Sequence, residues 1–124
     1  MKKRKTNKDL AIAIVIFAAL VALALLNYLL CTARLNDLER SAEGIECGDS
    51  AEAEAIKEKF YKTAFLLSVT LNHDDIEEAE EYLIELAEMA KGKDAAALSL
   101  AKSRLISAIK QLKRLSGISI DSII

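Results

Sequence analysis

Residues 10–30 read LAIAIVIFAALVALALLNYLL, a stretch with no charged side chain and a single amide, Asn27. An α-helix rises about 1.5 Å per residue, so about 20 residues cross the roughly 30 Å hydrocarbon core of a bilayer. Lipid offers no partner for backbone N–H and C=O groups, whereas a helix satisfies these groups within itself. We therefore predict a transmembrane anchor helix over residues 10–31.

Basic residues on the N-terminal side of this segment predict its orientation. The cluster consists of Lys2, Lys3, Arg4, Lys5 and Lys8. Few cations follow the segment closely, and acidic residues accompany them. Because Lys and Arg accumulate on the cytoplasmic side of membrane helices, the N-terminus is expected in the cytoplasm and the C-terminal domain outside the cell membrane. We interpret the cluster as a topology signal in a cytoplasmic tail, residues 1–9.

A cleaved signal peptide is the main alternative to a permanent anchor. Such peptides have an apolar region of about 7–15 residues and a small-x-small cleavage site. The apolar run here is longer, and Cys31-Thr32-Ala33 is a poor version of that site. The sequence favours a retained, single-pass signal anchor and leaves cleavage open.

The composition predicts an all-α protein with one small domain beyond the anchor. The 124 residues include no proline, no tryptophan and only four glycines, and the common residues Ala, Leu, Glu and Lys are strong helix formers. Residues 1–9 hold five of the 17 basic residues and one of the 19 acidic ones, so 12 basic and 18 acidic residues remain. A domain with this negative charge is poorly suited to binding nucleic acid.

Beyond the anchor we expect a juxtamembrane helix and turn over residues 32–48 and a helical domain over 49–124. Cys47-Gly48-Asp49-Ser50 is typical of a turn, and Asp49 or Ser50 would cap the next helix. The inner face of that helix is predicted at Ile56, Phe60, Ala64, Leu67 and Leu71. Because Phe65 and Val69 add apolar character on other sides, its second half is expected to be the most buried part of the domain.

A third helix is predicted after Asn72-His73, where the second one should stop. Asp74 and Glu77 fit the two ends of a capping box, and Gly92 would end the helix in a left-handed conformation. Its inner face is predicted at Ile76, Ala79, Leu83, Leu86 and Ala90.

The fourth helix is predicted to begin after an Asp94 cap and to close at Gly117. Its inner face is predicted at Leu98, Ala101, Leu105, Ala108, Leu112 and Leu115. Cations in its last turns would suit the negative end of the helix dipole: Lys110, Lys113 and Arg114. Residues 118–124 alternate like a short strand with no partner strand, so we expect an extended segment. Its isoleucines are expected to dock on the helices or on a partner: Ile118, Ile120, Ile123 and Ile124.

An internal repeat of about 45 residues relates the two halves of this region. Leu38, Ala42 and Asp49 shift onto Leu83, Ala87 and Asp94. Each copy is a helix, a short turn with an acidic cap, and another helix. This predicts two stacked helical hairpins in a small up-down bundle, although a shared bundle periodicity explains the repeat almost as well.

No residue pattern points to catalysis. The sequence lacks a Gly-x-Ser-x-Gly elbow, a phosphate-binding loop and zinc-ligand spacing. His73, the only histidine, lies beside Asp74 and Asp75, which could in principle hold a metal or relay a proton. We favour a structural role for His73 and Asp74 in a helix–helix turn, and the same for Gly92 and Asp94. No catalytic residue, metal or cofactor is expected.

Two further features leave alternatives open. The glutamates of the third helix form an acidic face that suits either solubility or a basic partner surface: Glu77, Glu78, Glu80, Glu81, Glu85 and Glu88. Cys31 and Cys47 would face an oxidising compartment. Their spacing does not decide between free thiols, an internal bridge and a bridge between two copies.

From about Phe60 to the end, the chain resembles a family of small, uncharacterised, single-pass membrane proteins of Gram-positive bacteria, a domain of unknown function. The resemblance rests on residues 71–76 (LNHDDI), on Gly92-Lys93-Asp94, and on residues 119–124 (SIDSII). The sequence departs from the family where it has Phe60 and Tyr61 in place of a frequent tryptophan, and Asp121-Ser122 where Asn is favoured. The resemblance implies no activity, and it implies a bacterial cell membrane and a multi-pass membrane protein as partner.

These observations together predict a non-enzymatic interaction module held outside the membrane, whose expected partner is another membrane protein. Its biological role and partner identity are not specified by the sequence, and a homo-oligomer is left open. The alternative is an accessory subunit or sensor that binds a small ligand or cation between its helices.

Overall fold

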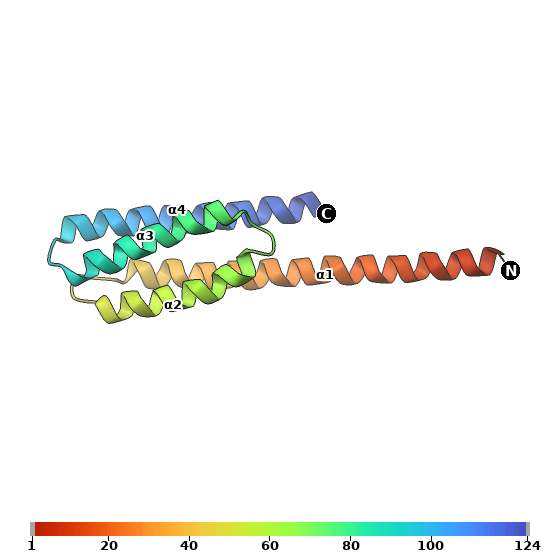
Figure 1. Ribbon diagram of the computed structural model, residues 1–124, viewed down its shortest axis with the longest axis horizontal. Coiled ribbons are helices and arrows are strands. Elements are labelled where there is room, and N and C mark those ends of the chain that lie inside the picture. Colours follow the sequence, from red (N-terminus) through yellow and green to blue (C-terminus); the bar gives the residue numbers. More distant parts are fainter. Residues whose placement is uncertain (1, 124) are drawn as a thin grey trace.

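The computed structural model describes the backbone of residues 2–123 and the side chains of residues 7–118. Four α-helices make up this part of the chain: α1 (Lys2–Glu43), α2 (Ser50–Leu67), α3 (His73–Lys91) and α4 (Ala95–Ile123). The helices run alternately up and down, each packs against the next, and α4 closes the ring against α1 (Figure 1). No strand occurs among the described residues. The prediction of an all-α chain built from two stacked hairpins is confirmed.

Helix α1 has two parts in different surroundings. Its N-terminal part projects beyond the bundle as a single rod (Figure 1), and its apolar side chains are open, with Leu20 60% and Leu23 62% exposed. From Cys31 onward α1 forms one wall of the bundle, with four inner residues buried: Cys31, Leu35, Leu38 and Ala42. The sequence analysis predicted a juxtamembrane segment 32–48 separate from the domain 49–124. In the structure, residues of that segment are part of the domain's core.

Helix α2 begins where predicted, at Ser50 after Asp49. Of its predicted inner residues, Ile56, Phe60 and Leu67 are buried, while Ala64 and Leu71 are partly buried against the core. The expectation that its second half is the most buried part of the domain is wrong, because the side chains of Phe65 and Val69 are 77% and 71% exposed.

The turn between α2 and α3 begins earlier than predicted. Helix α2 ends at Leu67, and the hydroxyl of Ser68 donates a hydrogen bond to the Phe65 carbonyl at 2.7 Å, which satisfies one of the free carbonyls at the helix end. The N-cap of α3 is Asn72 rather than Asp74, because Asn72 Oδ1 accepts the Asp74 N–H at 3.4 Å. Asp74 instead lies in the first turn, where a carboxylate favours the positive end of the helix dipole.

The turn between α3 and α4 is partly as predicted. Gly92 follows α3, but its φ of −90° and ψ of −171° are extended, so the predicted left-handed ending is wrong. Asp94 caps α4 as predicted, since its Oδ1 accepts the N–H groups of Ala96 and Ala97, each at 3.1 Å. Both helices bury their predicted inner faces, except that Ala108 and Leu115 are only partly buried, and Ile109 is an additional core residue of α4.

Helix α4 does not close at Gly117 but continues to Ile123. The extended tail predicted for residues 118–124 is therefore wrong as far as residue 123, and Ile124 lies outside the described backbone. The last turns of α4 run alongside α1 (Figure 1), and a Cβ added at Gly117 would lie 3.9 Å from Tyr28 Oη. A helix satisfies its backbone groups internally, which an unpaired extended segment beside an apolar helix could not do.

Candidate interaction surfaces

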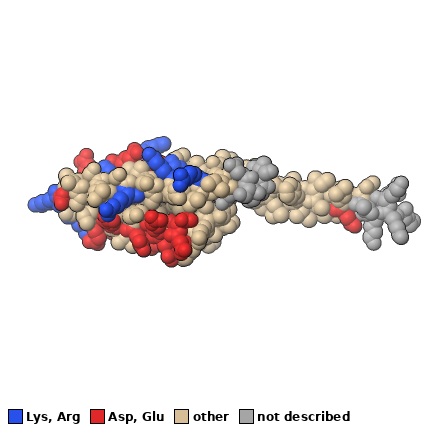
Figure 2. All heavy atoms as spheres, turned by 90° about the horizontal axis from the view of Figure 1, so that it is seen from above, with Lys and Arg blue, Asp and Glu red and all other residues tan. Residues whose placement is uncertain are grey.

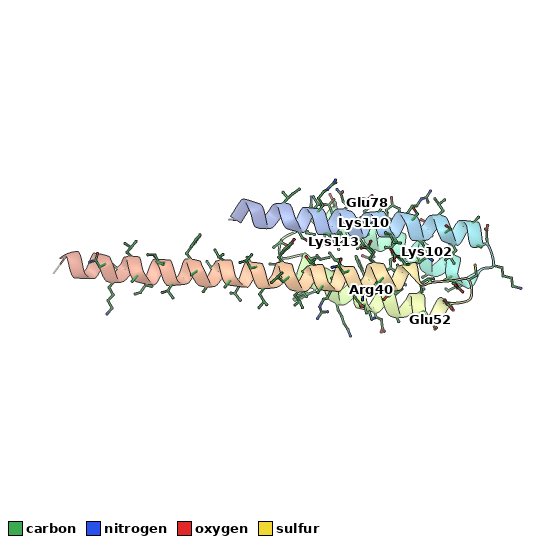
Figure 3. All side chains as sticks on the ribbon, turned by 180° about the vertical axis from the view of Figure 1, so that it is seen from behind. Arg40, Glu52, Glu78, Lys102, Lys110 and Lys113 are labelled. Atoms are coloured by element: carbon green, nitrogen blue, oxygen red, sulfur yellow. The ribbon has the colours of Figure 1, made fainter. Side chains whose placement is uncertain are left out.

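Ion pairs join α1 and α4 along their shared seam. Lys113 Nζ lies 2.6 Å from Glu39 Oε2 and 2.9 Å from Asn36 Oδ1, and Lys110 Nζ lies 3.8 Å from Glu39 Oε1 (Figure 3). The side chains of Glu39 and Lys113 are only 15% and 24% exposed. The predicted role of Lys110 and Lys113 at a helix C-terminus is wrong, because α4 continues well past them. Both instead pair with Glu39 of α1, Lys113 closely and Lys110 at the exposed rim.

A second set of contacts ties the two hairpins together at the end of the bundle far from residues 10–30. Lys102 Nζ donates to the Ile45 carbonyl at 2.9 Å, and the Gly48 N–H donates to the Ala90 carbonyl at 2.8 Å. Gly48 has a φ of 95°, a left-handed conformation that favours glycine. The α1–α2 turn is thereby fastened to both α3 and α4.

A surface groove of about 320 Å³ lies between the end of α1 and the start of α2. Its lining includes Arg40 and Glu52 (Figure 3), together with Asp49 and Lys59. Lys59 Nζ pairs with Asp37 at 3.4 Å, and both side chains are more than half exposed. Because charges of both signs line the groove, it has no single-sign field that would select a cation or an anion.

The glutamates of α3 give the bundle an acidic side. Figure 2 shows acidic side chains gathered on one side of the bundle, with basic ones interspersed elsewhere. Some of this charge is compensated within the chain, since Glu85 pairs with Arg104 at 3.0 Å and Glu88 with Lys91 at 3.3 Å. Among the described residues, no group of three or more His, Cys, Asp or Glu side chains is arranged to hold a metal ion.

His73 and Asp94 belong to turns at opposite ends of the bundle. His73 is the first residue of α3, its side chain is 77% exposed, and its Nε2 lies 3.0 Å from Glu77 Oε1. The structure does not bring His73 near Gly92 or Asp94, so the four residues assigned to turns form two separate structural sites. Asn72, which the sequence analysis did not identify as the cap of α3, belongs to the same site as His73 and Asp74.

The two cysteines are free thiols and form no bridge with each other. Cys31 is buried in the core, with its Sγ 3.9 Å from Asn27 Oδ1, and Cys47 is partly buried in the α1–α2 turn. Cys31, Asn27 and Ser116 line a small pocket where α4 passes α1. The Ser116 hydroxyl in this pocket is buried without a hydrogen-bond partner.

The remaining predicted residues lie near or beyond the limit of the described side chains. Lys8 and Ile118 are exposed, the latter by 54%. The side chains of the other topology residues and of Ile120, Ile123 and Ile124 fall outside the described part. No protein-family model, curated protein or solved structure matches the chain.

Proposed function

We propose that the protein is a single-pass membrane protein whose α1 spans the cell membrane and carries the helical bundle on the outer face. The observation that carries this is the exposure of the apolar part of α1. This helix is long and apolar enough to cross a membrane, and none of its most apolar 18-residue window is buried inside the structure. A bilayer would remove these side chains from water, which the protein itself does not do.

The orientation follows from the charges that flank the span. The cluster of Lys and Arg in residues 1–8 favours the cytoplasm, and Tyr28 at the other end suits the headgroup region. The resemblance of residues 71–76 and 119–124 to membrane proteins of Gram-positive bacteria supports a bacterial cell membrane.

We propose that the bundle acts as a non-enzymatic interaction module for another membrane protein. The charged pairs with the least exposure, Glu39 with Lys113 above all, lie between helices and serve packing. The outward face of α3 offers a different surface, where exposed glutamates surround Ile84, which is 43% exposed. An acidic rim around an apolar side chain suits a partner with a basic surface.

Photo-crosslinking in intact cells tests this role. A photo-reactive residue at position 84 of the full chain should give a discrete crosslinked product with a second membrane protein. The same residue at Leu100, which is 52% exposed near the start of α4, is the control for random collisions. If position 84 yields only uncrosslinked monomer, or the same products as position 100, the interaction role of α3 is wrong.

A further inference from the structure

On α1, α2 and α4, the exposed side chains change from charged to apolar toward the end of the bundle from which residues 10–30 project. On α1 the change falls between Arg34 and Leu30, both exposed. On α2 it falls between Lys62 and Phe65, which is 77% exposed and is followed by Val69 at 71%. On α4 it falls between Arg114 and Ile118, which is 54% exposed; Asp121 follows one turn later, beyond the described side chains.

The contacts place these three changes at one level of the bundle. Arg34 and Lys62 line the same groove between α1 and α2, and a Cβ at Gly117 would lie 3.9 Å from Tyr28 Oη. Because α2 and α4 both run antiparallel to α1, the residues that follow Lys62 and Gly117 lie further toward the apolar rod. Phe65 and Ile118 are therefore level with the outer end of residues 10–30.

The exposed apolar side chains lie on two opposite sides of the bundle. Helices α2 and α4 each pack against α1 and α3, so they occupy diagonal positions in the ring. Phe65 and Ile118 are exposed, while the inner residues of the same helices, Phe60 and Leu112, are buried. The two exposed side chains thus point outward from diagonal helices. A single protein partner would cover one of these sides, whereas a bilayer surrounds both.

We propose that the end of the bundle nearest the anchor is seated in the outer interfacial layer of the membrane, where Phe65, Val69 and Ile118 contact lipid. This inference rests on the proposed membrane anchoring, and it adds a lipid-binding surface to the folded domain. The exposed polar residues at the start of α3, Asn72, His73 and Asp74, lie at the same end of the bundle and remain hydrated among the headgroups. A bundle seated in this way is held against the membrane by α1 and by two further helices.

The absence of tryptophan from the chain makes a direct test available. Three single-tryptophan variants of the full chain, Phe65→Trp, Ile118→Trp and Leu100→Trp, are reconstituted into phosphatidylcholine vesicles whose lipids are brominated high on the acyl chain. Bromine quenches tryptophan fluorescence on contact. We expect the fluorescence at positions 65 and 118 to fall at least about twofold relative to vesicles without bromine, and position 100 to be unchanged. Circular dichroism of each variant verifies the helical fold.

A fourth variant, Leu23→Trp, separates the two proposals. Leu23 lies in the apolar rod and is 62% exposed. If position 23 is quenched but positions 65 and 118 match position 100, the lipid contact of the bundle is wrong and the anchor stands. If only one of positions 65 and 118 is quenched, the proposal that lipid contacts both sides of the bundle is wrong. If position 23 is not quenched, the anchor fails, and this inference fails with it.

Discussion

The two parts of α1 are both rich in apolar residues, yet they occupy opposite environments. Between residues 10 and 30, apolar side chains cover every side of the helix and most are exposed, as at Leu23 and Leu29, each 62%. After Cys31, apolar residues recur every three or four positions between charges, and Leu35 and Leu38 are at most 1% exposed. A helix that is apolar on one side needs a protein partner, whereas one that is apolar all round needs lipid or a complete protein shell.

The junction between the two parts is uninterrupted. Helix α1 contains no glycine or proline, and its helical hydrogen bonding continues from Lys2 to Glu43. Because sharp kinks generally need proline, a Gly/Ser pair or a bulge, a tilt or rotation of the rod should be transmitted directly to the bundle.

The largest difference between the two parts should appear when equivalent leucines are shortened. Leu35→Ala removes a side chain that is 0% exposed, and the free energy of unfolding should fall by about 3–5 kcal/mol. The matched change Leu29→Ala, at a 62% exposed position, should cost less than about 0.5 kcal/mol. Urea unfolding of the full chain in a mild detergent, followed by circular dichroism, gives both values. Equal losses would mean that both parts of α1 are packed alike.

A charge in the rod should have the next largest effect. Leu20→Arg places a cation near the middle of residues 10–30, where insertion into a bilayer is disfavoured by about 3 kcal/mol. The fraction of protein that resists alkaline extraction from cell membranes should drop, while Ser99→Arg on the exposed start of α4 should leave it unchanged. Unchanged extraction of Leu20→Arg would argue against a transmembrane position for this part of α1.

Substitutions in the ion pairs between α1 and α4 should lower the free energy of unfolding by less than Leu35→Ala does. Lys113→Met leaves the Glu39 carboxylate, 15% exposed, without its closest cation, and we expect a loss of about 1–2 kcal/mol. Lys110→Met removes a 65% exposed partner at 3.8 Å and should cost less than about 0.5 kcal/mol. Adding Glu39→Gln to Lys113→Met should restore part of the loss. Urea unfolding measures all three variants, and equal costs for the two lysines would show that the short Lys113 contact is unimportant.

Two aspartates at helix starts offer a finer comparison. Asp94→Ala removes an oxygen that accepts two N–H groups at 3.1 Å, and should lower the free energy of unfolding by about 1 kcal/mol. Asp74→Ala removes a first-turn charge that is not the cap, and should cost only about 0.3 kcal/mol. The reverse order in thermal or urea unfolding would restore Asp74 as the cap of α3.

The smallest effect is expected for the only histidine. His73→Asn removes an exposed pair with Glu77, and such pairs contribute less than about 0.5 kcal/mol. The midpoint of urea unfolding should therefore stay within error of the unsubstituted chain. A large drop would show that His73 organises the α2–α3 turn despite its exposure.

The local sequence pattern was enough to predict most of the fold. Spacings of three and four residues located the inner faces of α3 and α4, and the Asp94 cap located the start of α4. These features depend on neighbours within one helix or one turn. The short alternation of isoleucines after Gly117 predicted an extended segment, but α4 continues through it as a helix beside α1.

The contacts between helices could not be predicted in this way. Glu39 and Lys113 lie 74 positions apart in the sequence, and nothing in either segment indicates their pairing. The apolar character of Phe65 and Val69 predicts a highly buried second half for α2, and only the arrangement of the helices reveals that these two side chains face outward. A signal was present in the sequence, since both fall outside the inner spacing of Ile56, Phe60 and Leu67.

The accessibility of three single cysteines in living cells tests the central claim most directly. In a background with Cys31→Ala and Cys47→Ser, a membrane-impermeant maleimide is applied to intact cells that express Asn7→Cys, Leu20→Cys or Ser99→Cys. The account predicts labelling of position 99 in intact cells, of position 7 only after lysis, and of position 20 in neither case. Labelling of position 7 but not 99 in intact cells would reverse the orientation, and ready labelling of position 20 would contradict a membrane-spanning α1.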